Sequence, residues 1–127
     1  MVETAKIVIV DDEVHIRALL EQTLEDLDGG SEILTAANGA EGLALIERER
    51  PQLVFLDVMM PLMNGYEVCA AVRKNPNLAG TTIVMLTAKG QEADRTRGLE
   101  TGAHHFVTKP FDPDEILDLA REILQQT

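Results

Sequence analysis

Short apolar runs alternate along this chain with longer segments in which apolar residues recur at helical spacing. The short runs predict β-strands, because they are rich in β-branched residues and stop at polar or turn-forming residues. The predicted strands are residues 6–10, 32–37, 53–56, 82–87 and 104–108. The run at 53–56 is apolar at every position, which is typical of a strand that is buried on both faces of a sheet.

Between the strands, apolar residues three and four positions apart predict amphipathic helices with one face against a core. The third of these helices spans 66–73 with Asn64 as its cap, and the fourth, over about 91–101, is unusually polar. Gly29-Gly30 is expected to end the first helix, and residues 74–80 form a surface linker. The expected core positions are Ile16, Leu19, Leu20, Thr23, Leu24 and Leu27 in the first helix, Leu43, Ala44 and Ile46 in the second, Ala93 and Leu99 in the fourth, and Ile116, Leu119, Ala120 and Ile123 in the last.

Strands and helices that alternate in this way predict an α/β fold, with a doubly wound parallel sheet covered by helices on both faces. Right-handed crossover connections leave few topologies for five such strands. The flavodoxin-like strand order 2-1-3-4-5 is the expected one. With 127 residues, the chain has the length of one domain and can bury a core without disulfides or structural metals.

The composition narrows the possible partners. Eleven basic and 22 acidic residues give a formal net charge of -11, which disfavours direct binding to nucleic acids and to anionic membranes. No apolar run is long enough to span a membrane, and residues 1–6 lack the pattern of a signal peptide. The single cysteine, Cys69, cannot form an internal disulfide and is expected to be a buried small side chain. These features favour a soluble domain in the cytoplasm.

The candidate chemistry lies at the ends of the predicted strands. Asp11 and Asp12 follow the first strand, Asp57 the third, Thr87 ends the fourth and Lys109 follows the fifth. The carboxyl ends of parallel strands lie along one edge of a sheet, where ligands bind. Two like charges about 4 Å apart repel by roughly 4 kcal/mol near a protein surface, so three carboxylates there require a cation or a raised pKa. Carboxylate oxygens suit Mg²⁺, whereas zinc would require cysteine or histidine ligands.

At these positions the chain resembles a receiver domain, the phosphoacceptor module of bacterial two-component response regulators. The resemblance is closest to single-domain regulators of the chemotaxis type, and it covers essentially all of residues 1–127. It rests on four motifs in the expected order after four strands. They are Asp11-Asp12, the stretch DVMMPLMNG from Asp57 to Gly65, Thr87-Ala88, and Lys109-Pro110-Phe111.

The resemblance implies that Asp57 accepts a phosphoryl group from a phosphohistidine on a sensor histidine kinase or a phosphotransfer protein. Carboxylates are known nucleophiles for phosphoryl groups. It also implies that Mg²⁺, for which Mn²⁺ can substitute, is bound by Asp12, Asp57 and the carbonyl of Met59, with Asp11 reaching the ion through water. Such a domain catalyses its own phosphorylation and slow dephosphorylation, and it is not a multi-turnover enzyme.

The resemblance further implies a switch. Lys109 and Thr87 contact the phosphoryl oxygens, and Phe106 turns inward when Thr87 moves. The face formed by the last two helices and strand 5, including Leu117 and Leu124, then binds a downstream protein target or effector domain, or forms a homodimer on phosphorylation.

Two further features depend on the resemblance. Met59 and Lys89, two residues beyond Asp57 and Thr87, are expected to tune the loss of the phosphoryl group to water, with a lifetime of minutes or longer. The Lys109-Pro110 bond is expected to be cis by resemblance, although the sequence alone favours trans.

Other functions remain as alternatives. An unphosphorylated pseudo-receiver that serves only as an interaction module would share the fold and the motifs. A phosphatase of the haloacid dehalogenase class needs a second Asp two residues after the nucleophile, where this chain has Met59. A flavodoxin-like cofactor binder needs a phosphate-binding loop after the first strand, where Asp11, Asp12 and Glu13 would repel a phosphate. Whether the domain stands alone or belongs to a longer regulator stays open.

Overall fold

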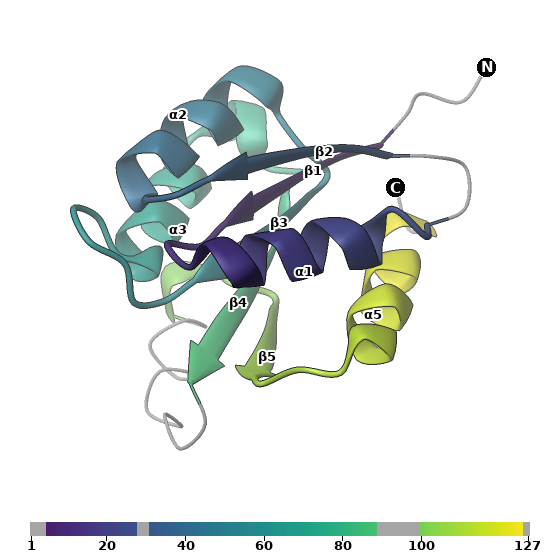
Figure 1. Cartoon of the computed structure of the whole chain (residues 1–127). Coiled ribbons are helices and arrows are strands. Elements are labelled where there is room, and N and C mark those ends of the chain that lie inside the picture. Colours follow the sequence, from purple (N-terminus) through teal and green to yellow (C-terminus); the bar gives the residue numbers. More distant parts are fainter. Residues whose placement is uncertain (1–4, 28–30, 89–99, 126–127) are drawn as a thin grey trace.

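The computed structural model describes residues 5–27, 31–88 and 100–125 (Figure 1). Its five strands form one parallel sheet in the order β2-β1-β3-β4-β5, which confirms the predicted topology. In chain order the elements are β1 (Ala5–Val10), α1 (Val14–Leu24), β2 (Ser31–Ala36), α2 (Gly39–Glu49), β3 (Leu53–Asp57), α3 (Gly65–Lys74), the 3-10 helix η1 (Pro76–Leu78), β4 (Thr82–Ala88), β5 (His105–Lys109) and α5 (Pro113–Gln125).

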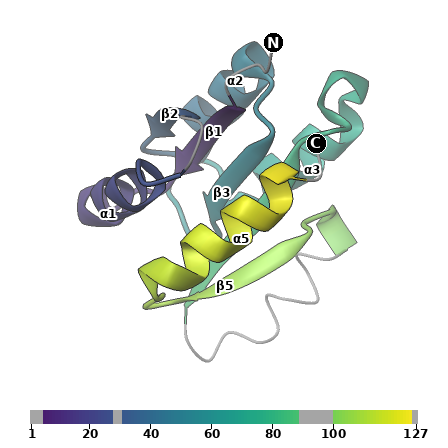
Figure 2. The same ribbon diagram turned by 90° about the vertical axis from the view of Figure 1, so that its right-hand side faces the viewer.

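Helices cover both faces of the sheet, α2 and α3 on one face and α1 and α5 on the other (Figures 1 and 2). The strand sequences explain the two layers, because successive side chains point to opposite faces. In β1, Val8 and Val10 pack in the α2–α3 core, whereas Ile7 and Ile9 pack in the α1–α5 core. Residues 53–56 of β3 are buried, as predicted from their uninterrupted apolar run, and Asp57 at the end of the strand is buried as well. No helix in the described ranges is long and apolar enough to span a bilayer.

The first helix is shorter than the sequence predicts. α1 ends at Leu24 and not at Gly29-Gly30, which lie outside the described residues. The backbone N–H groups of Asp26 and Leu27 donate to carbonyls three residues earlier, at 3.3 and 3.1 Å, and such bonds tighten and end a helix. This turn still places Leu27 in the core, whereas Leu19, an expected core residue, is 38% exposed.

Two other predictions need correction. In α2 the buried apolar residues are Leu45 and Ile46, whereas Ala44 is exposed. The reason is a close approach at Gly42, where a Cβ atom would lie 2.6 Å from Val10 Cγ1, so the face three and four residues further on packs against the sheet. The linker at 74–80 is not entirely a surface segment, because η1 buries Leu78.

The remaining expectations differ less. In α5, Ile116, Ala120 and Ile123 are buried, whereas Leu119 is only half-buried. Asn64 caps α3 as predicted, and it forms a reciprocal capping box with Glu67. Most of the fourth helix predicted at 91–101, including Ala93 and Leu99, lies outside the described residues.

Candidate functional site

The carboxyl ends of four strands bring the predicted site residues to one edge of the sheet. Asp11 directly follows β1, Asp57 ends β3, Thr87 is the second-last residue of β4, and Lys109 ends β5. Asp57 pairs in register with Leu86, so Thr87 lies one position further along the neighbouring strand. Asp11, Asp57 and Thr87 are all buried, whereas Asp12 is exposed.

Lys109 is the cation at the centre of this edge. Its Nζ lies 2.8 Å from Asp11 Oδ2, 3.3 Å from Asp57 Oδ1 and 3.6 Å from Glu13 Oε1. Glu13 also lies 3.1 Å from His15 through its other carboxylate oxygen. One ammonium therefore faces three carboxylates, and the site keeps an excess of negative charge.

The backbone around Asp11 holds its carboxylate in place. Asp11 Oδ1 accepts a hydrogen bond from the Glu13 N–H at 2.9 Å, and the Asp11 carbonyl accepts one from Arg17 at 2.7 Å. The Asp11 N–H donates to the Ala36 carbonyl of β2. The other carboxylate oxygen, Oδ2, is buried, and it faces the Lys109 ammonium at 2.8 Å. A buried carboxylate oxygen in this state is suited to a cation.

The acidic residues form a cluster that fits a hard divalent ion. One carboxylate oxygen each from Asp11, Asp12 and Asp57 lies within 4.8 Å of the other two. Asp12 is open to solvent while its two neighbours are buried, so an ion could keep water ligands on that side. The cluster offers only oxygen ligands, and Lys109 offsets only part of its negative charge, which matches the chemistry of Mg²⁺.

The crowding changes the acidity of Asp57. Burial, and then the negative charge of Asp11, raise the pKa of Asp57 to about 7, while Lys109 opposes the shift. For Lys109, burial alone would lower the pKa, but the hydrogen bond to Asp11 and the charges of Asp57 and Asp11 outweigh it, so the pKa is raised. Without a further cation, Asp57 is therefore only partly ionised near neutral pH, whereas Lys109 stays charged.

Gly65 sets the position of the loop after Asp57. A Cβ atom at Gly65 would lie 2.4 Å from the Asp57 carbonyl oxygen, and the Gly65 N–H donates to the Val58 carbonyl at 2.9 Å. Glycine therefore allows α3 to begin directly against the end of β3. The loop between them exposes two large apolar side chains, with Met59 71% and Leu62 84% exposed, and Leu62 has a φ of 72°.

The expected switch residues share one face of the sheet. Phe106 pairs in register with Met85, and Thr87 pairs with Thr108, so Phe106 lies diagonal to Thr87 on neighbouring strands. Phe106 is half-buried against the α2–α3 core. The Lys109-Pro110 bond is cis, as the resemblance implies.

The structure gives less support to the roles predicted for the remaining residues. Lys89 lies outside the described residues. Leu117 and Leu124 are half-buried against the α1–α5 core, so only part of each side chain is available to a partner. The Met59 side chain points to solvent, and the ligand role of its carbonyl stays a prediction. Cys69 is buried as expected, and its Sγ donates to the Thr101 carbonyl at 3.3 Å.

Two residues of the site were not anticipated from the sequence. Glu13 contacts Lys109, and Arg17 binds the Asp11 carbonyl. Their positions in the sequence could have indicated that they lie at the site. Glu13 precedes the first residue of α1, and Arg17 lies one turn later, so both point back toward the end of β1.

Comparisons with known proteins agree with this geometry. The family model described as "Response regulator receiver domain" matches residues 7–121. The chain is 48% identical over 122 residues to "Probable transcriptional regulator ycf27" of Cyanophora paradoxa, covering 96% of this chain and 49% of that protein. It is 43% identical over 122 residues to "Alkaline phosphatase synthesis transcriptional regulatory protein PhoP" of Bacillus subtilis, with coverage of 96% and 49%. The chain thus spans about half the length of these curated relatives.

Solved structures are similar over nearly the whole chain. The chemotaxis response regulator CheY4 of Vibrio cholerae superposes with a TM-score of 0.86 at 36% sequence identity, and the match covers 95% of this chain and 99% of that chain.

Proposed function

The chain belongs to the family of response regulator receiver domains, and from this premise we propose that its Asp57 accepts a phosphoryl group. The donor is the phosphohistidine of a sensor histidine kinase or of a phosphotransfer protein. The observation that carries the proposal is the position of Asp57, buried at the end of β3 beside both the Lys109 ammonium and the Asp11 carboxylate.

The proposed reaction is a single displacement at phosphorus. A carboxylate oxygen of Asp57 forms a new bond to phosphorus, the phosphorus–nitrogen bond of the donor breaks, and its electron pair stays on the imidazole. Asp57 must be ionised to attack, and Lys109, 3.3 Å from its Oδ1, favours the ionised form. Lys109 can then pair with an oxygen of the transferred group without leaving Asp11.

The acidic cluster fits the divalent ion that this reaction requires. Asp12, Asp57 and the carbonyl of Met59 would bind Mg²⁺, or Mn²⁺ in its place, and Asp11 would reach the ion through water. When bound, the ion supplies positive charge to the phosphoryl oxygens, the main electrostatic need of phosphoryl transfer. The chain contributes the spacing of its carboxylates and the Gly65 junction that keeps the loop after Asp57 close to them.

The output depends on the switch residues. Thr87 moves toward the phosphoryl group, and Phe106 turns inward on the same face of the sheet. β5, α5 and the segment before β5 then present a changed surface to a downstream target or effector domain, or to a second phosphorylated copy. The exposed parts of Leu117 and Leu124 contribute to that surface. We place this signalling in the cytoplasm.

Met59 and Lys89 tune the lifetime of the phosphoryl group. Met59 cannot donate or accept a proton, so it cannot activate water two residues from Asp57, and we expect a lifetime of minutes or longer. The same reasoning disfavours a phosphatase of the haloacid dehalogenase class. Loss of the label within seconds from the purified protein would contradict the expectation.

Acetyl phosphate with Mg²⁺, followed by intact mass spectrometry, tests the proposal. The wild type is expected to gain the mass of one phosphoryl group, and Asp57→Asn is expected to gain none. Asp26→Asn, which changes an exposed carboxylate in the turn after α1, is the matched control and should label like the wild type. An unlabelled wild type would instead support an unphosphorylated interaction module.

A further inference from the structure

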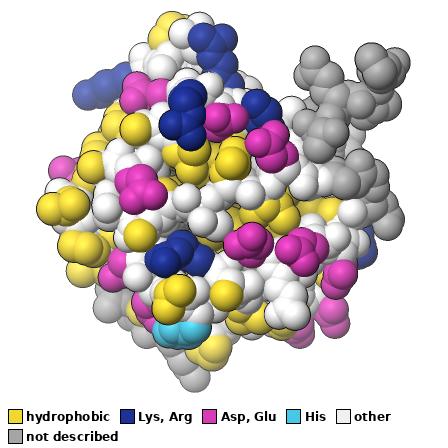
Figure 3. All heavy atoms as spheres, turned by 45° about the horizontal axis from the view of Figure 1, so that its top comes forward, with side chains coloured by type: hydrophobic (Ala, Val, Ile, Leu, Met, Phe, Trp, Pro, Cys, Tyr) yellow, Lys and Arg dark blue, Asp and Glu magenta, His cyan; other side chains and the backbone are white. Residues whose placement is uncertain are grey.

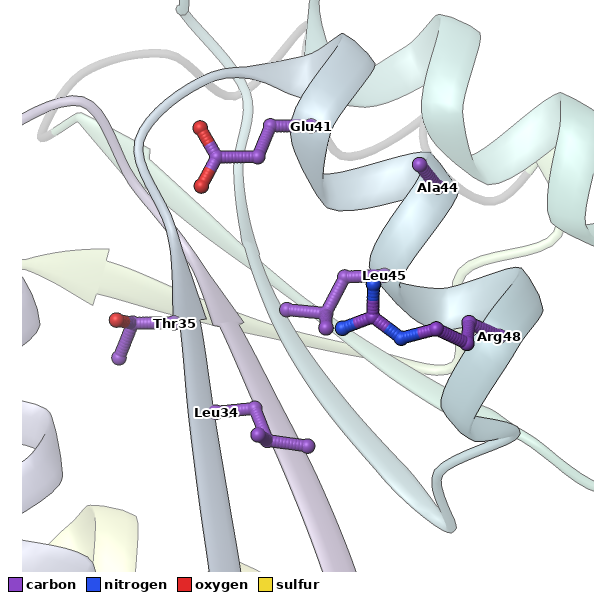
Figure 4. Close-up of a pocket in the computed structure, with 6 residues that line it drawn as sticks. All are labelled: Leu34, Thr35, Glu41, Ala44, Leu45 and Arg48. Carbon is purple, nitrogen blue, oxygen red and sulfur yellow. The ribbon is translucent and has the colours of Figure 1, made fainter.

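A pocket of about 320 Å³ lies between the edge strand β2 and helix α2, away from the phosphorylation site (Figure 4). Its lining is Leu34 and Thr35 from β2, and Glu41, Ala44, Leu45 and Arg48 from α2. Leu34, Ala44 and Leu45 supply its apolar lining, whereas Glu41 lies toward one end and the Arg48 guanidinium lies beside Leu45. Figure 3, which brings the α2 side forward, shows exposed apolar side chains among acidic and basic ones.

The strand beside this pocket has an open edge. Among the described residues, β2 pairs only with β1. The Ala36 carbonyl accepts a hydrogen bond from Asp11, so Ala36 and Leu34 direct their backbone groups inward, and Ile33 and Thr35 direct theirs outward. Ile33 and Leu34 are half-buried on opposite faces of the sheet. An edge with apolar residues on both faces and no proline is suited to pair with another strand.

The charges on α2 indicate what kind of partner supplies the strand that pairs with β2. Glu41 and Arg48 are seven residues apart, about two helical turns, so they lie on the same side of α2 with Ala44 between them. Their charges are opposite, and a two-fold axis between two α2 helices would place each Glu41 opposite an Arg48. Within the described residues Glu41 forms no ion pair, and Arg48, whose side chain is 68% exposed, pairs only with its neighbour Glu49.

We propose that this surface binds a second copy of the same chain, through antiparallel pairing of two β2 strands about a two-fold axis at Leu34. Ile33 of each copy then pairs with Thr35 of the other, using the backbone groups that point outward. The two five-stranded sheets become one, with both α2 helices on the same face. The two pockets join into one groove over both Leu34 side chains, and Glu41 and Arg48 pair across it.

Reciprocity favours a second copy over an unrelated partner. A two-fold interface must be complementary to itself, and α2 meets this condition by carrying one charge of each sign, three residues before and four residues after Ala44. β2 lies at the edge of the sheet opposite to β5. The pairing therefore leaves the proposed output surface on β5 and α5 free, and it does not require a phosphorylated Asp57.

Sedimentation equilibrium over a series of protein concentrations tests the proposal. Salt near 0.15 M shortens the range of repulsion between two chains of charge -11 to about 8 Å. The wild type is expected to dimerise, and Glu41→Arg or Arg48→Glu alone should weaken the dimer by roughly tenfold, because each creates two like-charge contacts. The double variant with both changes should recover wild-type affinity. Lys74→Glu, a charge reversal at the exposed end of α3, is the control and should have no effect.

Disulfide trapping tests the register independently. Residues opposite each other on antiparallel strands are close enough for a disulfide bond. In a Cys69→Ala background, Leu34→Cys should therefore oxidise to a covalent dimer. Glu32→Cys should not, because Glu32 faces Ala36 of the second copy and not Glu32. A wild type that stays monomeric at millimolar concentration, a double charge variant without recovery, or equal trapping of both cysteines would each overturn the proposal.

Discussion

The two ends of the parallel sheet differ in how their charged and polar groups are paired. At the carboxyl end, Asp11, Asp12 and Asp57 crowd together, and Lys109 offsets only part of their charge. At the amino end, charged and polar groups are mostly paired one to one. The contrast separates a site with excess negative charge, which can bind a cation, from a part of the fold whose polar groups are already paired.

At the amino end of the sheet, an ion pair and several hydrogen bonds satisfy the polar groups. Lys6 pairs with Glu49 at 3.1 Å, and its backbone N–H donates to the Gln52 side chain at 2.7 Å. Thr81 donates its hydroxyl to the Pro51 carbonyl at 2.8 Å. The Ile83 N–H donates to Nδ1 of His104, which extends the pairing of β4 and β5 beyond the first residue of β5. Only Arg73 Nε is buried without a partner among the described side chains at this end.

The difference shows which end of the sheet can gain stability by binding an ion. Buried groups that are already paired gain nothing from an added ion. Carboxylates that repel one another gain stability when a cation or a positively charged group arrives. The carboxyl end is therefore less stable than its packing allows, and binding of an ion can recover that difference.

Removing the lysine at each end should give the largest contrast. Lys109→Met leaves two buried carboxylates without their cation, and we expect the unfolding free energy at pH 8 without metal to fall by about 3 kcal/mol. Lys6→Met breaks a partly exposed pair whose lysine remains accessible to solvent, and it should cost less than about 1 kcal/mol. Urea denaturation measures both. Equal losses would contradict the contrast.

Adding one methyl group at the Asp57 junction should have the next largest effect. Gly65→Ala places a Cβ atom 2.4 Å from the Asp57 carbonyl oxygen, so β3 and α3 must separate. We expect a loss of about 2 kcal/mol and slower labelling by acetyl phosphate. Gly80→Ala, where a Cβ atom meets nothing within 4 Å, is the control. If the two alanine variants behaved alike, the junction would not position the site.

The pKa of Asp57 predicts a pH dependence that is specific to the carboxyl end. A carboxyl group whose folded pKa is raised, here to about 7, contributes stability that is complete below its unfolded value of 3.8 and is lost as pH rises through 7. Wild type without metal should therefore lose stability between pH 5 and 8 relative to Asp57→Asn. We expect the variant to gain about 2 kcal/mol at pH 8. Parallel pH profiles for the two proteins would refute this.

The amino end should show the opposite sign and the smallest effect. Burial, followed by the charges of Arg73 and His105, lowers the pKa of His104 from 6.5. A histidine with a lowered pKa contributes stability that is present above 6.5 and is lost as pH falls through the folded value. Protonated Nδ1 can no longer accept the Ile83 N–H bond of 3.1 Å. The melting temperature should fall slightly more below pH 6 for wild type than for His104→Asn, which keeps an acceptor.

The fold was predictable because its signals are local. The apolar runs at 6–10 and 53–56 marked two strands of the sheet, and the uninterrupted run in β3 marked a strand that is buried on both faces. The errors arose where tertiary contacts decide. Leu45 is buried because Gly42 lets α2 approach Val10, and no periodicity within α2 reveals that approach.

The site was predictable to the level of residue type and strand end. A parallel sheet necessarily gathers Asp11, Asp57 and Lys109 at one edge. The sequence does not show how many carboxylates a single lysine contacts. The contacts of Lys109 with three carboxylates depend on side-chain conformation and on the direction in which α1 leaves β1.

A magnesium titration of the thermal stability of the metal-free protein at pH 8 tests the central claim most directly. We expect the melting temperature of wild type to rise with Mg²⁺, and its decline between pH 5 and 8 to disappear. Asp12→Asn, which removes an exposed carboxylate from the cluster, should weaken the Mg²⁺ response at least about tenfold, whereas Asp112→Asn should not. A melting temperature that ignores Mg²⁺, or that rises equally in Asp12→Asn and wild type, would contradict the account.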